Sequence, residues 1–266
     1  MSDPRIEQVR AWRPAVAGIT EVLHARFVGH SYPMHAHDNW TLLIVDDGAV
    51  RYDLERHRHG VPGHAVSLLP PHIPHNGQAA TAAGFRKRVL YLDRDQLPEH
   101  LIGRAVDTPT FTDALLYDRI GRLHTALGRP GDELEAGGRL ALIGERLRAL
   151  LSGRGPEPRR TDPALARMLR DLLETHVVEG ISLSEAATAL HADPTHLVRA
   201  FGREYGMPPH RYLVSRRVDL ARALLLSGVP TRDVAAATGF HDQPHLTRHF
   251  RRIVGVTPAR YARSGG

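Results

Sequence analysis

In the first third of the chain, apolar residues either alternate with polar ones or occur in short runs. Further along the chain, apolar residues recur with the period of an α-helix. Runs with the length of strands occur at Thr41–Val45, Ala49–Leu54, Ala65–Leu69 and Arg88–Leu92. The Asp47-Gly48 pair between the first two runs favours a hairpin turn. The pattern from about Leu23 to Asp93 therefore predicts a small β-barrel or sandwich.

Two helical segments follow these strands, near Asp113–Leu127 and Glu133–Leu151. Apolar residues of the second segment recur at helical spacing, at Leu134, Leu140, Ile143, Leu147 and Leu150 or Leu151. An apolar face of this kind could cover the barrel, or it could pair with a second copy of the chain. The spacing leaves both possibilities open.

The chain divides at Ser152–Arg160, because this segment is rich in Gly and Pro and has no apolar side chain that could pack in a core. We expect a first domain at residues 1–151, a linker at 152–161 and a second domain at 162–263. Helix start signals follow the linker at Asp162-Pro163, Ser182-Leu183-Ser184-Glu185 and Asp193-Pro194. The second domain is therefore predicted to be all-helical.

The C-terminal domain contains an internal repeat. A shift of 49 residues aligns His196–Arg203 with His245–Arg252, and nine of the eighteen positions from His196 to Leu213 are identical. Each copy follows an Ala-rich helix and a short turn, which is the plan of a helix-turn-helix unit. An amphipathic helix from Arg211 to Leu226 joins the two copies.

The second helix of each copy has an apolar face and an arginine-rich face. Leucine and phenylalanine lie four residues apart on the first face, at Leu197 and Phe201 and again at Leu246 and Phe250. Two such units could place their second helices in successive major grooves of DNA. The alternative is a plain helical bundle with arginine on its solvated face, which gives no reason for the repeat.

Residues Asp162–Ala262 resemble the DNA-binding region of the AraC/XylS family of bacterial transcription regulators. The resemblance lies in Gly239-Phe240, His245-Leu246-Thr247-Arg248-His249-Phe250-Arg251-Arg252 and Gly255-Val256-Thr257-Pro258-Ala259-Arg260-Tyr261. It implies base-edge contacts from Thr195, His196 and Arg199 in the first unit, and from Gln243, His245 and Arg248 in the second. Arg203 and Arg252 are expected to bind phosphates. His191 stands where the family usually has a turn glycine, which predicts backbone strain.

The first domain is rich in histidine, at His35-Ala36-His37 and Pro70-Pro71-His72-Ile73-Pro74-His75. With Gly29 and Gly48, these segments resemble the cupin motifs of AraC/XylS sensor domains. The resemblance implies a cupin-like barrel that binds a small-molecule effector and has helices through which such regulators dimerise. The expected effector-binding residues are His35, His37, Thr41, Tyr52 and His75.

The histidines also offer a metal site, because His35 and His37 project from the same face of a strand. Together with His75 they could bind Zn²⁺, Ni²⁺, Fe²⁺ or Mn²⁺. Thr41 or Leu42 stands where a metal-binding cupin generally has glutamate. This missing carboxylate favours effector binding over a metal cofactor.

Composition supports the DNA interpretation. The net charge is +6, and Lys87 is the only lysine among 35 basic residues. Arginine suits phosphates and guanine edges, so double-stranded DNA is the expected partner. The chain has no cysteine, which excludes disulfides and thiolate metal sites. We find no signal peptide and no run of about 18 apolar residues, so we expect a cytoplasmic protein without a membrane partner.

These observations predict a multidomain α and β protein. An N-terminal cupin-like β-barrel carries two trailing helices, and a C-terminal all-α domain holds two helix-turn-helix units joined by a linker helix. The expected function is effector-controlled, sequence-specific transcription regulation by a homodimer, which would contact RNA polymerase if it is an activator. We expect no enzymatic activity; the alternative is a His-ligated metal cupin enzyme fused to a helical domain.

Overall fold

A computed structural model describes residues 7–29, 31–55, 57–153 and 162–263, so most of the predicted linker lies outside the described residues. The chain divides into two compact units. The first unit runs to Thr125 and resumes at Leu142, whereas the second contains Ala126–Ala141 together with the C-terminal helices. In the described ranges no helix is both long and apolar enough to cross a membrane.

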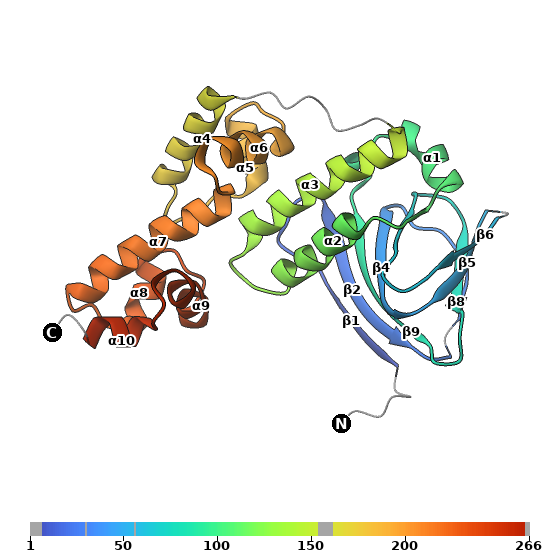
Figure 1. The fold of residues 1–266 in the computed structure, drawn as a ribbon, viewed down its shortest axis with the longest axis horizontal. Helices are drawn as coiled ribbons and strands as arrows, with labels where there is room; N and C mark the ends of the chain where they lie inside the picture. The colour runs from blue at the N-terminus through green and yellow to red at the C-terminus, as the bar shows by residue number, and fades with distance from the viewer. Residues whose placement is uncertain (1–6, 30, 56, 154–161, 264–266) are drawn as a thin grey trace. The chain divides into compact units, whose positions relative to one another are not determined.

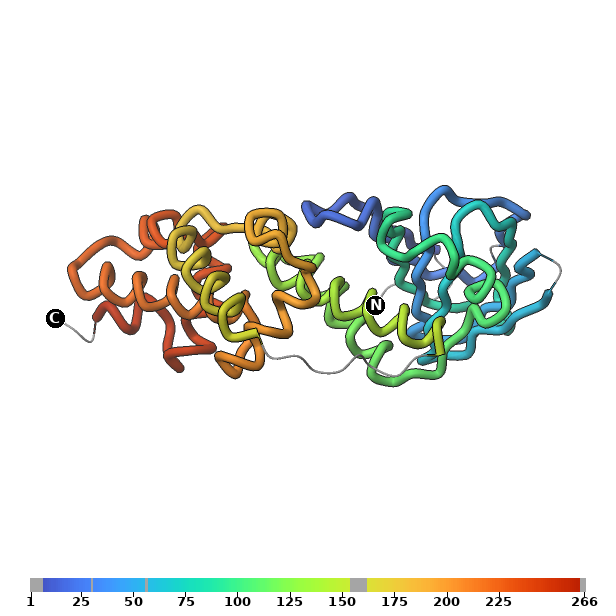
Figure 2. Tube along the Cα trace, turned by 90° about the horizontal axis from the view of Figure 1, so that it is seen from above, coloured from blue at the N-terminus to red at the C-terminus, as the bar shows by residue number. Residues whose placement is uncertain are grey.

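The first unit is built on two antiparallel sheets (Figure 1). One sheet has the order β1 (Gln8–Trp12), β2 (Ile19–Phe27), β9 (Phe85–Leu92), β4 (Trp40–Gly48), β7 (Val66–Leu69) and β10 (Thr110–Phe111). The other has the order β3 (Ser31–His35), β8 (His75–Ala79), β5 (Val50–Leu54) and β6 (His57–Val61). Figure 2 shows these strands, blue to teal, from a direction at right angles.

Alternate residues of both sheets fill a common interior. The buried cluster includes Phe27 of β2, Phe85 and Val89 of β9, and Val50 and Tyr52 of β5. Since side chains alternate between the two faces of a strand, this cluster fixes which residues of each strand point inward. The predicted barrel is therefore confirmed, with Tyr52 in its core.

The predicted hairpin at Asp47-Gly48 is wrong. Strand β4 pairs with β7 and β9, whereas β5 pairs with β6 and β8, so the chain passes between the two sheets at Gly48. Gly48 has φ +74°, and a Cβ there would lie 2.1 Å from the carbonyl oxygen of Gly84. The glycine thus permits a close sheet-to-sheet crossing, because both edges of β4 already have partners.

Helices follow the barrel strands. Short helices η1 (Arg94–Gln96), η2 (Glu99–Leu101) and α1 (Ile102–Asp107) precede a hairpin of α2 (Ala114–Leu127) and α3 (Glu133–Ser152), visible in Figure 1. In α2, Leu116, Ile120 and Leu123 are fully buried. The Tyr117 hydroxyl donates to Asp46 of β4 at 3.1 Å, so α2 covers the barrel. Pairing with a second chain stays a prediction.

The C-terminal helices of the second unit are α4 (Pro163–Thr175), α5 (Leu183–Ala189), α6 (Pro194–Tyr205), α7 (Pro209–Leu226), α8 (Thr231–Ala237), α9 (Gln243–Val254) and α10 (Pro258–Arg263). Figure 1 shows α7 running from the group α4–α6 to the group α8–α10. The predicted all-helical domain with a long linking helix is confirmed.

Candidate DNA-binding and ligand-binding sites

The first helix-turn-helix unit consists of α5 and α6. A capping box starts α5, because the Ser182 hydroxyl accepts from the Glu185 amide and the Glu185 carboxylate accepts from the Ser182 amide. The Asp193 carboxylate caps α6 by accepting from the amides of Thr195 and His196. Each start signal read from the sequence therefore has its expected partner.

The second unit, α8 and α9, repeats this arrangement. The Asp242 carboxylate caps α9 by accepting from the His245 amide at 2.7 Å. The buried ring of Phe250 lies 5.4 Å from that of Tyr261, and in the first unit Phe201 lies 5.5 Å from Tyr212. The sequence repeat is thus also a repeat of packing.

Both units have a residue with positive φ in the turn before the second helix. His191 has φ 48° and Gly239 has φ 76°. The strain predicted at His191 is confirmed, since a residue with a Cβ occupies the left-handed region there.

The predicted DNA-contacting residues differ in exposure. On α6, Thr195 is 8% exposed, and His196 Nε2 lies 3.2 Å from Asp162 Oδ2. On α9, Gln243 and Arg252 are exposed, whereas His245 is buried. The remaining predicted contacts are half-buried Arg199 and Arg248, and exposed Arg203. Roles for all eight residues in DNA contact stay predictions.

Asp132, which precedes α3, is the main residue of the second unit that the sequence analysis missed. Arg248 Nη2 donates to both of its carboxylate oxygens, at 2.8 and 2.9 Å. The imidazoles of His245 and His249 each approach Asp132 Oδ1 to 3.4 Å. Burial raises the pKa of Asp132, but its contacts with His245, His249 and Arg248 outweigh this and lower the pKa overall. The carboxylate is therefore ionised at neutral pH.

In the first unit the structure brings His35, His37 and His75 together. Ring centroids are 4.8 Å apart for His35 and His37, 4.6 Å for His35 and His75, and 5.2 Å for His37 and His75. Burial, followed by the neighbouring imidazoles and Lys87, lowers the pKa of His37 to about 4. The His37 imidazole is consequently neutral at physiological pH.

Thr41 and Tyr52 also lie in the barrel, but they make different contacts. The Thr41 hydroxyl is buried and has no hydrogen-bond partner within the described part of the chain. Thr41 pairs in register with Tyr91, whose ring lies 5.0 Å from His37. In contrast, the Tyr52 hydroxyl is within 2.8 Å of the Ser67 hydroxyl, and the Tyr52 ring stacks on His59 at 5.4 Å.

Lys87 is a further barrel residue that the sequence analysis missed. It lies between Arg86 and Arg88 on β9 and shares a strand face with the core residues Phe85 and Val89. Its ammonium is 4.3 Å from the ring centroid of Tyr32, and burial lowers its pKa to about 8. Strand alternation alone would have predicted its inward position.

The three histidines satisfy part of what a divalent metal needs. His35 Nδ1 and His75 Nδ1 contact the backbone carbonyls of Pro33 and Ile73 at 2.7 and 3.0 Å, which leaves their Nε2 atoms as acceptors. Their ligand atoms and that of His37 lie within 4.8 Å of one another. The nearby ammonium of Lys87 opposes a second cation, so the donor set fits a metal while its electrostatic surroundings disfavour one.

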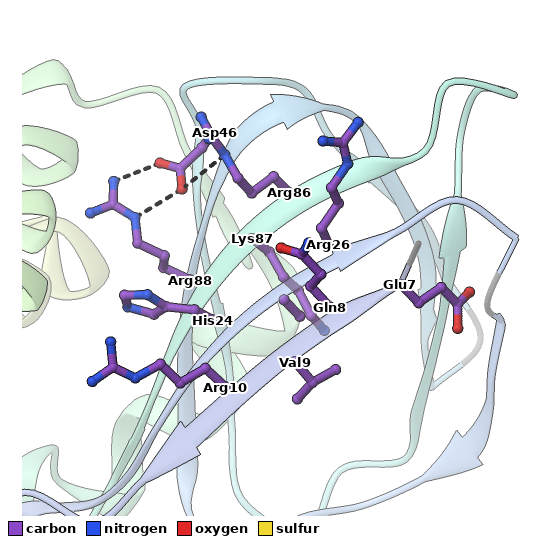
Figure 3. Close-up of a pocket in the computed structure, with 11 residues that line it drawn as sticks. Glu7, Gln8, Val9, Arg10, His24, Arg26, Asp46, Arg86, Lys87 and Arg88 are labelled. Carbon is purple, nitrogen blue, oxygen red and sulfur yellow. Dashed lines mark hydrogen bonds and ion pairs between the residues drawn. The ribbon is translucent and has the colours of Figure 1, made fainter. Parts of the chain in front are cut away.

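A separate groove of about 790 Å³ involves β1, β2, β4 and β9 (Figure 3). Arg88 donates to the two oxygens of Asp46 at 2.6 and 2.9 Å, and Arg86 lies beside them. His24 Nε2 is 3.1 Å from His124 Nδ1 of α2. This basic groove contains none of the residues that the sequence analysis assigned to a site.

Comparisons with known proteins match both units. Residues 18–144 match the family model described as an AraC-like ligand binding domain, and residues 186–264 match a helix-turn-helix domain. The transcriptional activator RhaS of Klebsiella pneumoniae is 25% identical over 255 residues, or 91% of this chain and 92% of RhaS. The multiple antibiotic resistance protein MarA of Salmonella typhimurium is 30% identical over 104 residues, or 39% of this chain and 82% of MarA.

The solved DNA-binding domain of the global transcriptional factor AdpA, in complex with a target DNA, is 28% identical with a TM-score of 0.35. The match covers 39% of this chain and 93% of that domain. Matches to several other curated regulators span only 29% to 38% of those proteins.

A ligand-binding barrel followed by a helix-turn-helix domain defines the class of one-component transcription regulators. The chain belongs to the AraC/XylS family of these regulators. This confirms the resemblance found in the sequence. Its relatives are named as transcription regulators, which supports the expected lack of enzymatic activity.

Proposed function

We propose that this protein regulates transcription by binding specific DNA sequences, and that a small molecule in its barrel controls the binding. The observation that carries the proposal is the repeated packing of α6 and α9, each capped by an aspartate and anchored by a buried phenylalanine. Two equivalent helices joined through α7 suit two segments of major groove. The regulator would act in the cytoplasm, where bacterial DNA is found.

The two recognition helices would divide their contacts between bases and phosphates. Base edges would meet Thr195, His196 and Arg199 of α6 and Gln243, His245 and Arg248 of α9. Arg203 and Arg252 would bind phosphates, which makes affinity depend strongly on salt. His245 and Thr195 are buried in this structure, so their part in reading requires that these surfaces become uncovered.

Fluorescence anisotropy on DNA selected from a random duplex pool tests this division. We expect Arg248→Ala to cost about 1–3 kcal/mol and to relax sequence preference, whereas Arg252→Ala should weaken binding to all sequences alike. An equal loss on every sequence from Arg248→Ala would contradict its assignment to a base. If the wild-type chain selects no sequence under any effector condition, the proposed function is wrong.

The effector would bind inside the barrel through His35, His37, Thr41 and His75, with Tyr52 supporting the wall. Lys87 adds a cation there, and among the described residues no carboxylate lies within ion-pair distance of its ammonium. An effector with a carboxylate or another strong acceptor would satisfy Lys87 and the unpartnered Thr41 hydroxyl.

A thermal-shift screen of carboxylic acids against the matching neutral alcohols tests this chemistry. We expect acids to stabilise the wild-type protein and Lys87→Met to abolish the shift. Arg86→Met is the matched control, because Arg86 is the adjacent residue on the same strand and its side chain is 61% exposed. Equal shifts from acids and alcohols would refute an acidic effector.

A metal at His35, His37 and His75 is the competing occupant. Metal analysis of protein purified without an affinity tag separates the two, and we expect no stoichiometric Zn²⁺, Ni²⁺, Fe²⁺ or Mn²⁺. A bound equivalent that His75→Ala removes would instead establish the metal site.

We also propose that the protein acts as a homodimer, and that it contacts RNA polymerase if it is an activator. Leu115 of α2 is 51% exposed, so it can be changed without disturbing the core to which the fully buried Leu116 belongs. Light scattering of the wild type and of Leu115→Glu measures the oligomeric state. A monomer at micromolar concentration would contradict the homodimer.

A further inference from the structure

The polar face of α9 is occupied by a carboxylate from the same compact unit. Arg248 contacts Asp132 through two hydrogen bonds, and Asp132 is only 6% exposed. A carboxylate offers a pair of acceptor atoms, as a phosphate does with two oxygens and a guanine edge does with O6 and N7. Asp132 therefore engages the group that α9 would present to DNA.

The same part of the chain also reaches α6. The Thr195 hydroxyl donates to the carbonyl oxygen of Ala141 at 3.4 Å. Gly138 also lies close to Val198, because a Cβ on Gly138 would be at ordinary van der Waals distance, 3.6 Å, from Val198 Cγ2. Ala126–Ala141, which we name the cover segment, thus contacts both proposed recognition helices.

Close packing fixes the cover segment against α9. Gly131 has φ +89°, and a Cβ there would lie 2.3 Å from Cε1 of His245. Glu133, two residues further on, accepts from the Gly131 amide at 3.0 Å and so stabilises the turn itself. The turn conformation that brings Asp132 to Arg248 therefore has little room for a side chain at Gly131.

A metal ion is the other occupant that Asp132, His245 and His249 suggest, since their ligand atoms lie within 4.8 Å of one another. The His245 Nδ1 atom accepts from the His241 amide at 3.2 Å, and its Nε2 atom lies 3.4 Å from Asp132 Oδ1 without a hydrogen-bond partner in the described part of the chain. Arg248 already supplies a cation to the carboxylate. These contacts favour an ion pair over a metal.

We propose that the cover segment is an autoinhibitory element: Asp132 sequesters Arg248, and DNA binding requires their separation. The inference rests on the proposed function, and it adds that the cover segment competes with DNA for the recognition helices. Helix α3 continues from the cover segment into residues of the first unit, which gives an effector a covalent route to this contact. If only open molecules bind DNA, the apparent affinity equals the intrinsic affinity multiplied by the fraction of molecules that are open.

The test uses the full chain and a duplex selected from a random pool, with Kd measured by fluorescence anisotropy. We expect Asp132→Asn to bind roughly tenfold more tightly than the wild type, because a closed-state ion pair is lost. Gly131→Ala should also tighten binding, and it leaves every charge in place. Glu133→Gln is the matched control for removing one negative charge, with an expected change under about twofold, because the glutamine side-chain oxygen can still accept from the Gly131 amide.

A double-mutant cycle shows whether Asp132→Asn tightens DNA binding by releasing Arg248. In an Arg248→Ala background, Asp132→Asn should give no further tightening if it acts by releasing Arg248. Equal tightening by Asp132→Asn and Glu133→Gln would overturn the proposal, as would persistence of the full effect without Arg248. Zn²⁺ that binds stoichiometrically and is lost in Asp132→Asn would also replace the proposal with a metal site.

Hydrogen exchange of the unmodified protein gives a test that needs no variant. Adding the selected duplex should increase deuterium uptake in peptides from the cover segment, since its contacts with α6 and α9 are released. Unchanged or reduced uptake would overturn the proposal even if the variants fail to fold. If neither the wild type nor Asp132→Asn selects DNA, the proposed function itself is wrong and the inference falls with it.

Discussion

His210 of α7 should make the stability of the second unit depend on pH. Its Nε2 lies 3.6 Å from Glu135 Oε2, and a charged pair there would raise its pKa. Burial is the larger effect and lowers the pKa to about 4. Glu135 also accepts from the Arg139 guanidinium at 2.8 Å, which reduces its attraction for a second cation. The His210 imidazole is therefore neutral in the folded protein.

Proton linkage gives the sign and the size of the change in the free energy of unfolding with pH. A histidine with a folded pKa near 4 and an unfolded pKa of 6.5 binds fewer protons when folded, so stability falls as pH drops through 6.5. The loss is complete below the folded pKa. Between pH 7 and pH 5 these two values give a loss of about 2 kcal/mol.

Urea unfolding of the full chain at both pH values measures this loss. Both tryptophans, Trp12 and Trp40, lie in the first unit, so far-UV circular dichroism is the appropriate signal for the helices of the second. In His210→Gln the loss on acidification should shrink by about 2 kcal/mol, since other titrating groups are common to both proteins. Parallel pH dependences for the two proteins would refute the reasoning.

Three further changes test the helix-turn-helix units. His191→Gly should raise stability by up to about 1 kcal/mol in thermal unfolding, because it relieves a φ of 48°; a lower midpoint would contradict this. Gly239→Ala should cost about 3 kcal/mol or more, because its Cβ would lie 2.2 Å from the carbonyl oxygen of Val178; near-normal stability would show that the turn can shift. Asp242→Ala should cost about 1 kcal/mol by uncapping α9, with Asp242→Asn as the control that keeps an acceptor.

The helices of the second unit could be predicted from the sequence because their capping contacts join residues that are close together in the chain. The cap of α6 involves Asp193 and amides two and three residues away, and the sequence pattern specifies such contacts directly. The repeat then predicted equivalent packing, which Phe201 and Phe250 confirm. In the barrel, strand alternation places Tyr52 on one face with Val50 and Leu54, and Lys87 on one face with Phe85 and Val89, and both of these faces point inward.

The failures involve contacts between distant segments. The Asp47-Gly48 pair has the composition of a hairpin turn, but which strands pair depends on partners elsewhere in the barrel. Asp132 is 116 residues from Arg248 in the sequence. In the sequence Asp132 has only the character of a turn residue before a helix, so its contact with α9 could not be inferred from local pattern.

The repeat also shows that similar sequence can have different electrostatic consequences. The first histidine of each motif faces an aspartate: His196 Nε2 lies 3.2 Å from Asp162 Oδ2, and His245 Nε2 lies 3.4 Å from Asp132 Oδ1. Both side chains of the first pair are 38% exposed, so screening by water and salt makes the interaction between them weak. The second pair is 3% and 5% exposed, and Asp132 also binds Arg248. Loss of a partner there leaves a buried group unpaired, which makes α9, rather than α6, the helix whose release should govern DNA binding.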